Sequence, residues 1–375
     1  MRYTIPIIVT ALLFGCCTSN NHSIATLEVI DSSEVIEVSN PLSQDPSVSF
    51  EDMVDSLTFI PLETSDNCVV SDIRSIAISQ KYIYVLDYNY AVSVFDINGR
   101  FVRRIPKGQG PDEISYARVL CFDSENKLLY VFDSSQGKML VFNEDGTFRN
   151  NYYPENHISM EDFEYFDGEF IVVPTVSLRG NQEMEVLVCD SVLNTRKIVS
   201  LGKVNPRISI NKYLQKCSDK VVISKVLSKD IYNYSQGSFC RKYILDDNNY
   251  DASLMYMGNT WETDQYQCFL FIPNTNGAHE RFIVRNKKTN SIWCNKFVPN
   301  SVFNGIDPMG FRIYDYYDNK IFSVIYPGYS SIGNSDYHWD GSNPNNLISE
   351  ADMEKLKAIK SDDNPVIVLL KLKNI

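Results

Sequence analysis

The chain has 375 residues, of which 44% are hydrophobic and 12% aromatic, enough for one large core or for two ordinary domains. Its formal net charge is −12, and this acidic excess argues against binding to nucleic-acid backbones, which requires clustered lysine and arginine. We therefore expect no nucleic-acid partner. The 23 tyrosines and 20 phenylalanines are typical of β-sheet surfaces.

The first 16 residues resemble a bacterial lipoprotein signal peptide. A positively charged start is followed by an apolar run over residues 5–14, which is too short to span a bilayer as a helix. The small residue Gly15 directly precedes Cys16, so we predict that Cys16 is lipidated and anchors the protein to a lipid membrane. An ordinary secretory signal and lipidation at Cys17 are the alternatives.

Residues 17–50 are rich in Ser, Asn, Asp and Pro, which predicts a flexible tether before a folded domain at 51–375. No later segment is apolar enough to span a membrane, so we expect that domain to be extracytoplasmic in the cell envelope. Thr18–Asn21 lack the acidic run that often accompanies surface display. This favours the periplasmic face of the outer membrane over the cell surface.

The eight cysteines after Cys16 show neither a C-x-x-C pair nor a zinc-finger spacing. Disulfides are compatible with an oxidising compartment, but Cys121 and Cys189 lie inside apolar strand-like runs. We therefore expect mostly small buried thiols.

The best-defined stretch is a predicted three-stranded meander over Tyr82–Asp87, Ala91–Ile97 and Arg100–Ile105. Asn98 and Gly99 separate the last two runs, and this dipeptide is a strong hairpin signal because both turn residues need positive φ. A loop with two glycines and a proline follows at 107–113.

Parts of this meander recur. Tyr84–Asp87 is repeated at Tyr130–Asp133 and Val94–Gly99 at Val141–Gly146, with offsets of 46 and 47 residues. Weaker strand groups follow at 169–201, 220–245, 267–295 and 310–325. A period of 40 to 50 residues with three or four strands is typical of propeller blades. The sequence predicts an all-β, six-bladed β-propeller over 56–375; two sandwich domains are the alternative.

The two ends of this region predict how the ring closes. The apolar run Asn364–Lys373 is the last strand, and Ser56–Glu63 belongs to no complete unit. We expect both strands to share one blade. A short helix N-capped by Ser349 should pack on the ring through Met353, Leu356 and Ile359.

Several motifs resemble a family of six-bladed β-propeller lipoproteins of Bacteroides-type bacteria, similar to NHL and TolB-like propellers. They are Phe59–Thr64, Ile83–Asp87 followed by Phe95–Gly99, Lys107–Glu113, and Asp363–Val366. The resemblance covers about residues 50–375 and implies the fold and an envelope location, but no activity.

Two loops contain candidate ligand-binding residues. Lys107, Gln109 and Glu113 could form one wall of a site near the channel entrance, or their loop could be a structural crossover that needs glycine. The polar, aromatic stretch 326–340 suits sugar or peptide recognition, unless its side chains pack on one another. Its candidate residues are Tyr329, Tyr337, His338 and Trp339.

Asp87 and Asp133 end equivalent strands, which indicates that they cap turns. A metal site at the channel, for which calcium would be suited, requires carboxylates from several blades to converge. The carboxylates available for it are Glu113, Asp162, Glu164 and Asp307. The four histidines are isolated and no nucleophile motif occurs, so we assign no catalytic residue, metal ligand or cofactor.

These features favour a lipid-anchored, extracytoplasmic binding or interaction module whose ligand is a glycan, a peptide or an envelope protein. One alternative is a metal-dependent hydrolase or lyase of the lactonase type. Another is a scaffold in an envelope complex.

Overall fold

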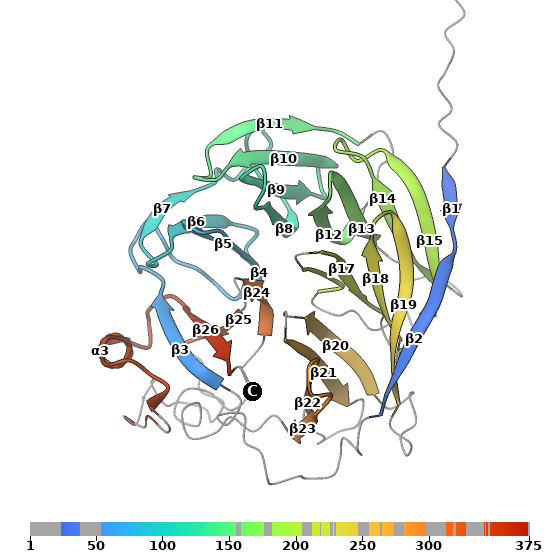
Figure 1. Ribbon diagram of the computed structural model, residues 1–375. Coiled ribbons are helices and arrows are strands. Elements are labelled where there is room, and N and C mark those ends of the chain that lie inside the picture. The colour runs from blue at the N-terminus through green and yellow to red at the C-terminus, as the bar shows by residue number, and fades with distance from the viewer. Residues whose placement is uncertain are drawn as a thin grey trace, which may run out of the picture.

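The strands form small antiparallel sheets arranged radially around a centre, which is a β-propeller (Figure 1). The computed structural model describes residues 24–37, 54–154, 159–175, 182–204, 212–217, 219–225, 228, 230–246, 255–262, 265–273, 281–296, 313–317, 320–327, 341, 343 and 346–373.

Six sheets are present among these residues. Four successive strands form each of the first two, namely β4 (Ile73–Ile78), β5 (Tyr82–Asp87), β6 (Val92–Asp96) and β7 (Phe101–Arg104), then β8 (Ala117–Asp123), β9 (Leu128–Asp133), β10 (Lys138–Asn143) and β11 (Phe148–Tyr152). The next two sheets contain β12 (Met160–Phe166), β13 (Glu169–Pro174), β14 (Gln182–Cys189) and β15 (Thr195–Val204), then β16 (Leu214–Lys216), β17 (Val221–Ser224), β18 (Asp230–Ser235) and β19 (Ser238–Asp246). The last two contain β20 (Met255–Glu262), β21 (Tyr266–Pro273), β22 (Arg281–Asn286) and β23 (Ile292–Lys296), then β24 (Ile313–Tyr317), β25 (Lys320–Ile325), β26 (Val366–Leu372) and β3 (Val54–Pro61).

The first strand of each sheet lies nearest the centre of the ring (Figure 1). Contacts run from β4 to β8, from β8 to β12, from β12 to β16, and from β20 through β24 back to β4. The fourth and fifth sheets meet where β17 contacts β20. The predicted propeller fold is confirmed, while the count of six blades stays a prediction.

The hydrophobic core lies between the sheets. Tyr84 and Val94 of the first sheet, for example, share a buried cluster with Leu129 and Leu140 of the second. Four further clusters each join two neighbouring sheets in the same way. A single small sheet cannot bury both faces alone, so stacking around an axis supplies the missing cover.

The ring closes through strands from both ends of the chain, as predicted. β3 pairs antiparallel with β26, with Phe59 opposite Val368. The buried side chain of Asn364 reinforces this closure, because its Nδ2 donates to the carbonyls of Glu63 and Cys68, both at 2.7 Å. Its Oδ1 accepts from the Val70 amide at 2.8 Å.

The predicted helix is α3 (Glu350–Ala358), which contacts β3 and buries Leu356. Ser349 caps it by accepting from the Asp352 amide at 3.1 Å. Lys355 Nζ donates to the Phe59 carbonyl at 3.0 Å and so fixes the helix to the closing strand. Among the described residues, no helix is both long and apolar enough to cross a membrane.

The predicted tether over 17–50 is wrong for part of its length. Residues 25–37 contain two strands, β1 (Ala25–Leu27) and β2 (Val29–Glu37), which add in parallel to β15 and β19. Strand structure is therefore present well before the predicted domain boundary at 51. The backbone groups of β1 and β2 find partners on sheet edges that are distant in sequence.

Candidate functional site

A cavity of about 550 Å³ opens at the centre of the ring, which is a volume suited to a small ligand. Inner strands of several sheets line it, because their first strands converge on the axis. The lining combines apolar side chains, here called the apolar wall, with acidic and basic side chains, here called the polar wall. The lining residues are Ile76, Ala77, Ile78, Ser79, Gln80, Leu120, Cys121, Phe122, Ser124, Glu125, Lys127, Glu144, Glu164, Lys212, Lys216, Cys217 and Phe322.

Glu164 on β12 is the central charged group of the polar wall. Its side chain is buried and forms an ion pair with Lys212, whose Nζ lies 3.0 Å from Oε1. The Cys121 thiol on β8 donates to Oε2 of the same carboxylate at 3.1 Å. Three segments far apart in sequence thus meet at one carboxylate, which has a partner for each oxygen.

Lys216 adds a second ammonium group to this wall. It is half-buried, and no ion pair to it occurs within the part of the chain that the structure describes. Because Lys212 pairs with Glu164, Lys216 is a cation of the lining whose charge that ion pair does not use. Glu125, Glu144 and Lys127 line the same cavity.

The two cavity thiols are poor nucleophiles. Burial, followed by the charge of Glu164, raises the pKa of Cys121 well above its usual value. Burial also raises the pKa of Cys217 to about 12, and its Sγ donates to the Glu262 carbonyl at 3.4 Å. Since the thiolate is the reactive form, both side chains act here as small buried groups. The other four described thiols are also free, as expected, and of these Cys68, Cys189 and Cys268 are buried.

Asp162 lies two residues before Glu164 and joins neighbouring sheets. Its Oδ2 accepts from the amides of Tyr213 and Leu214 at 2.7 and 2.8 Å. Burial raises the pKa of this carboxyl group to about 7, and the nearby Glu164 contributes to the shift. The amide hydrogen bonds and Lys212 oppose the shift without cancelling it.

The crossover loop at 107–113 does not line the cavity. Glu113 turns its carboxylate into the loop, where Oε2 accepts from the Gly110 amide at 2.8 Å. Lys107 Nζ donates to the Asn89 carbonyl at 2.8 Å, and Gln109 is exposed. A ligand-binding role for Lys107, Gln109 and Glu113 stays a prediction, but the contacts of Lys107 and Glu113 are those of a structural crossover.

The buried Lys138 on β10 fastens this loop to the next sheet, because its Nζ donates to the Gly110 carbonyl at 2.5 Å. Asp133 has the predicted turn-capping role and accepts from the amides of Ser115 and Ser135 at 2.5 and 3.0 Å. Asp87 caps equivalently, accepting from the Ala91 amide at 2.9 Å.

The remaining predicted site residues, Tyr329, Tyr337, His338 and Trp339, lie outside the described residues, as do Cys16 and Asp307. Of the carboxylates considered for a metal site, Glu113 lies in the crossover loop and Glu164 lines the cavity. No metal-binding cluster of His, Cys, Asp or Glu occurs among the described residues.

Sequence reasoning named Asp162 and Glu164 as candidates but missed Lys212, Lys216 and Cys121. The two acidic residues were named only as carboxylates available for a metal site. Lys212, Lys216 and Cys121 belong to no motif, so nothing along the chain indicated that they meet.

Comparison with known proteins finds one matching sequence family and several similar structures. A family described as "Domain of unknown function (DUF4934)" matches residues 33–371. A candidate exported protein of Bacteroides fragilis has a similar structure, with a TM-score of 0.69 and 16% identity over 91% of this chain and 100% of its own. A DUF4221-family member from Bacteroides vulgatus has a TM-score of 0.50 and 12% identity over 86% and 98%. No curated protein matches the sequence. Identities this low show a shared fold only.

Proposed function

Because the chain belongs to the DUF4934 family, whose description assigns no function, we propose from its geometry that it is a binding module of the bacterial envelope. Its ligand occupies the central cavity. The observation that carries this proposal is a cavity of about 550 Å³ whose polar wall holds the Glu164–Lys212 ion pair and Lys216, which forms no ion pair with any described residue.

We propose six blades for the ring. The six sheets, the cyclic contacts of their inner strands and the shared closing sheet support this count. A central channel between radially packed sheets is the usual ligand position in such a ring.

The ligand that suits this cavity is amphipathic and carries one anionic group. Lys216 provides a cation for a carboxylate, and the apolar wall around Ile76 and Phe122 provides a surface for a ring face or an aliphatic chain. Peptides with a free carboxyl terminus and acidic oligosaccharides both have this chemistry. A preformed ion pair at Glu164 favours binding over catalysis, because each carboxylate oxygen is already engaged.

The envelope location rests on the lipoprotein-like signal and on the structural similarity to a candidate exported protein of Bacteroides fragilis. We propose lipidation at Cys16 and attachment to the periplasmic face of the outer membrane. Ile24, the first described residue, follows Cys16 by eight residues, a distance of at most about 28 Å when extended. The anchor would thus hold the rim of the ring near the membrane. Fractionation of a Cys16→Ser variant tests this, since continued membrane association would contradict lipidation there.

The binding test is a calorimetric screen of carboxylated peptides and acidic oligosaccharides against the chain from residue 17 onward. We expect Lys216→Gln to weaken the best ligand about tenfold, because a charge-assisted hydrogen bond is lost. Lys357→Gln is the matched control, since Lys357 lies on α3 and is paired with Glu354. Equal affinities for both variants would contradict the cavity proposal, and capture of an envelope protein without any small ligand would favour the scaffold alternative.

A further inference from the structure

Residues 24–37, which we call the strap, lie along the outside of the ring (Figure 1). β1 pairs in parallel with β15, with Ala25 opposite Lys197. β2 then pairs in parallel with β19, with Val29 opposite Phe239. The strap therefore crosses from the outer edge of one sheet to the outer edge of the next.

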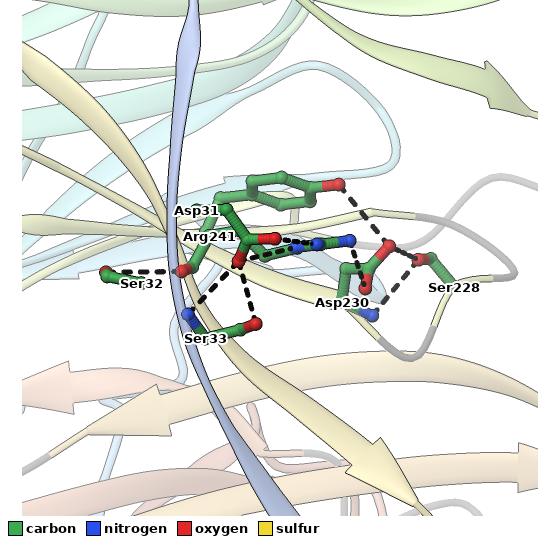
Figure 2. Close-up of polar contacts among 7 residues, drawn as sticks. Asp31, Ser32, Ser33, Ser228, Asp230 and Arg241 are labelled. Carbon is green, nitrogen blue, oxygen red and sulfur yellow. Dashed lines mark hydrogen bonds and ion pairs between the residues drawn. The ribbon is translucent and has the colours of Figure 1, made fainter.

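Figure 2 shows the polar contacts that fix the register of β2. Both oxygens of Asp31 accept from the Arg241 guanidinium, with Nε at 3.3 Å from Oδ1. Asp230 lies on the other side of the same guanidinium, with 3.7 Å between Arg241 Nη1 and Asp230 Oδ1. The backbone and hydroxyl of Ser33 also donate to Asp31 Oδ1, at 3.2 and 2.8 Å. A two-pronged contact of this kind selects a planar carboxylate at one position.

A second carboxylate of the strap lies on the opposite face of the fourth sheet, because Arg241 and Tyr243 of β19 pair with the adjacent residues Tyr232 and Ile231 of β18. Asp31 lies opposite Arg241, and Glu34 lies opposite Tyr243. The two strap residues between them, Ser32 and Ser33, therefore face the single β19 residue Lys242, which makes this a β-bulge. Residues directly opposite each other point to the same face of a sheet. Glu34 consequently reaches Arg285 on β22, whose guanidinium carbon lies 5.9 Å from the centre of the Tyr243 ring.

Apolar contacts add to this recognition. Ile36 is 2% exposed and packs in the cluster between the fourth and fifth sheets. Leu27 and Val29 pack against the cluster between the third and fourth sheets. In contrast, Ile30 and Val35 are each 54% exposed, so the strap is covered only in part.

The strap resembles a bound ligand more than a blade strand. The four sheets to which the strap adds no strand contain four strands each among the described residues, so four strands suffice for a blade. The strap adds a fifth strand to the other two, in parallel, and 16 residues separate it from β3. Strand addition to an exposed sheet edge is a common mode of peptide recognition, in which the backbone gives affinity and side-chain contacts give specificity.

We propose that the outer edges of β15 and β19 form a strand-binding site for an extended acidic segment, and that residues 24–37 of the same chain are its resident occupant. Two carboxylates separated by two residues meet Arg241 and Arg285, and one apolar residue enters the core. The occupant is separable from the ring, which keeps its fold when the strap is exchanged.

The test uses the full folded chain with a protease recognition sequence inserted between residues 44 and 45. After cleavage, a fluorescent peptide of residues 24–37 is added in excess. Fluorescence anisotropy should show that it replaces the cleaved strap, while circular dichroism of the ring stays unchanged. The peptide carrying Asp31→Asn and Glu34→Gln should bind at least tenfold more weakly. Unfolding upon displacement, absence of exchange, or equal binding of both peptides would overturn the proposal.

A charge exchange tests the register. Arg241→Asp should abolish exchange with the natural peptide and restore it with an Asp31→Arg peptide. Arg149→Asp is the matched control, because Arg149 lies exposed on β11, an outer strand without a fifth neighbour. Should the Arg241→Asp protein not fold, the two peptides on the unaltered ring still decide the outcome.

Discussion

The buried carboxyl group of Asp162 makes the stability of the folded ring depend on pH. Its pKa is raised to about 7 because burial disfavours the carboxylate, and the ordinary value is 3.8. Between these two pH values the folded chain holds a proton that the unfolded chain has lost. The stability from this group is therefore fully present below about pH 4 and is lost as the pH rises to about 7.

We expect the urea concentration at the denaturation midpoint to decrease as the pH rises from about 4 to about 7, and Asp162→Asn to remove this part of the pH dependence. Urea titrations at several pH values provide the measurement. Asp133 is a matched control with the opposite sign: burial opposes the shift, but hydrogen bonds from Ser115, Ser135 and Gln136 prevail and lower its pKa. The stability from Asp133 is thus lost as the pH falls. Identical pH profiles for the natural chain and Asp162→Asn would contradict the assignment.

Sequence patterns predicted residue roles best where the repeat supplied a second example. Asp87 and Asp133 recur at one blade position, and both cap turns. Glu164 had no such counterpart, and its partners Lys212 and Cys121 come from two other sheets. Convergence of this kind depends on how the sheets stack, which periodicity and spacing along one chain do not encode.

Among the elements, the crossover loop at 107–113 allows a test of whether its glycines are required by the structure of the loop or by a bound ligand. A Cβ on Gly108 would lie 2.0 Å from Glu113 Oε2, so Gly108→Ala must displace that carboxylate. We expect a loss of about 0.5–1.5 kcal/mol in the free energy of unfolding, because the displaced carboxylate gives up its hydrogen bond from the Gly110 amide. Cavity-ligand affinity should stay unchanged, because the loop does not line the cavity.

A double-mutant cycle isolates the cause. Glu113→Ala removes the obstructing carboxylate, so adding Gly108→Ala to it should cost much less than adding Gly108→Ala to the natural chain. Strictly additive losses, measured by chemical denaturation, would show that the clash with Glu113 is not the reason for the glycine.

Some secondary-structure elements could be predicted from the sequence, and others could not. The meander β5–β7 was predicted because its hairpin turns, such as Asn98-Gly99, are local signals. The predicted turn type is wrong: Gly99 has a positive φ of 86° but Asn98 does not, and the Gly99 amide donates to the Asp96 carbonyl at 2.9 Å. The strap was predicted to be part of a tether because residues 17–50, taken together, are rich in Ser, Asn, Asp and Pro, and because its partners lie about 200 residues away. Half of residues 24–37 are nevertheless hydrophobic, several of them β-branched, and this local strand signal was missed.

For the whole molecule, closure depends on few residues from the two ends of the chain. The apolar run Asn364–Lys373 and the unpaired run Ser56–Glu63 predicted a shared sheet, and β26 with β3 confirms it. The role of Asn364 was not predicted, because its three partners lie about 300 residues earlier. A motif that includes this residue, Asp363–Val366, was nevertheless part of the family resemblance.

Asn364→Ala should therefore open the ring before it unfolds any single blade. The substitution leaves the Val70 amide and the carbonyls of Glu63 and Cys68 without their side-chain partner in a buried place, for a cost of about 3 kcal/mol or more. Because β3 and β26 form the sheet that joins the chain ends, hydrogen exchange should accelerate first in these two strands.

Asn151→Ala is the matched control for this closure. Asn151 also donates from Nδ2 to a carbonyl, that of Pro111 at 2.5 Å, but the contact is exposed and lies within sequence-adjacent blades. It should change the free energy of unfolding by less than about 1 kcal/mol, since water replaces an exposed partner. If hydrogen exchange in Asn364→Ala accelerates equally over all sheets, the ring unfolds as one unit. The closing sheet would then contribute no more to stability than the other sheets.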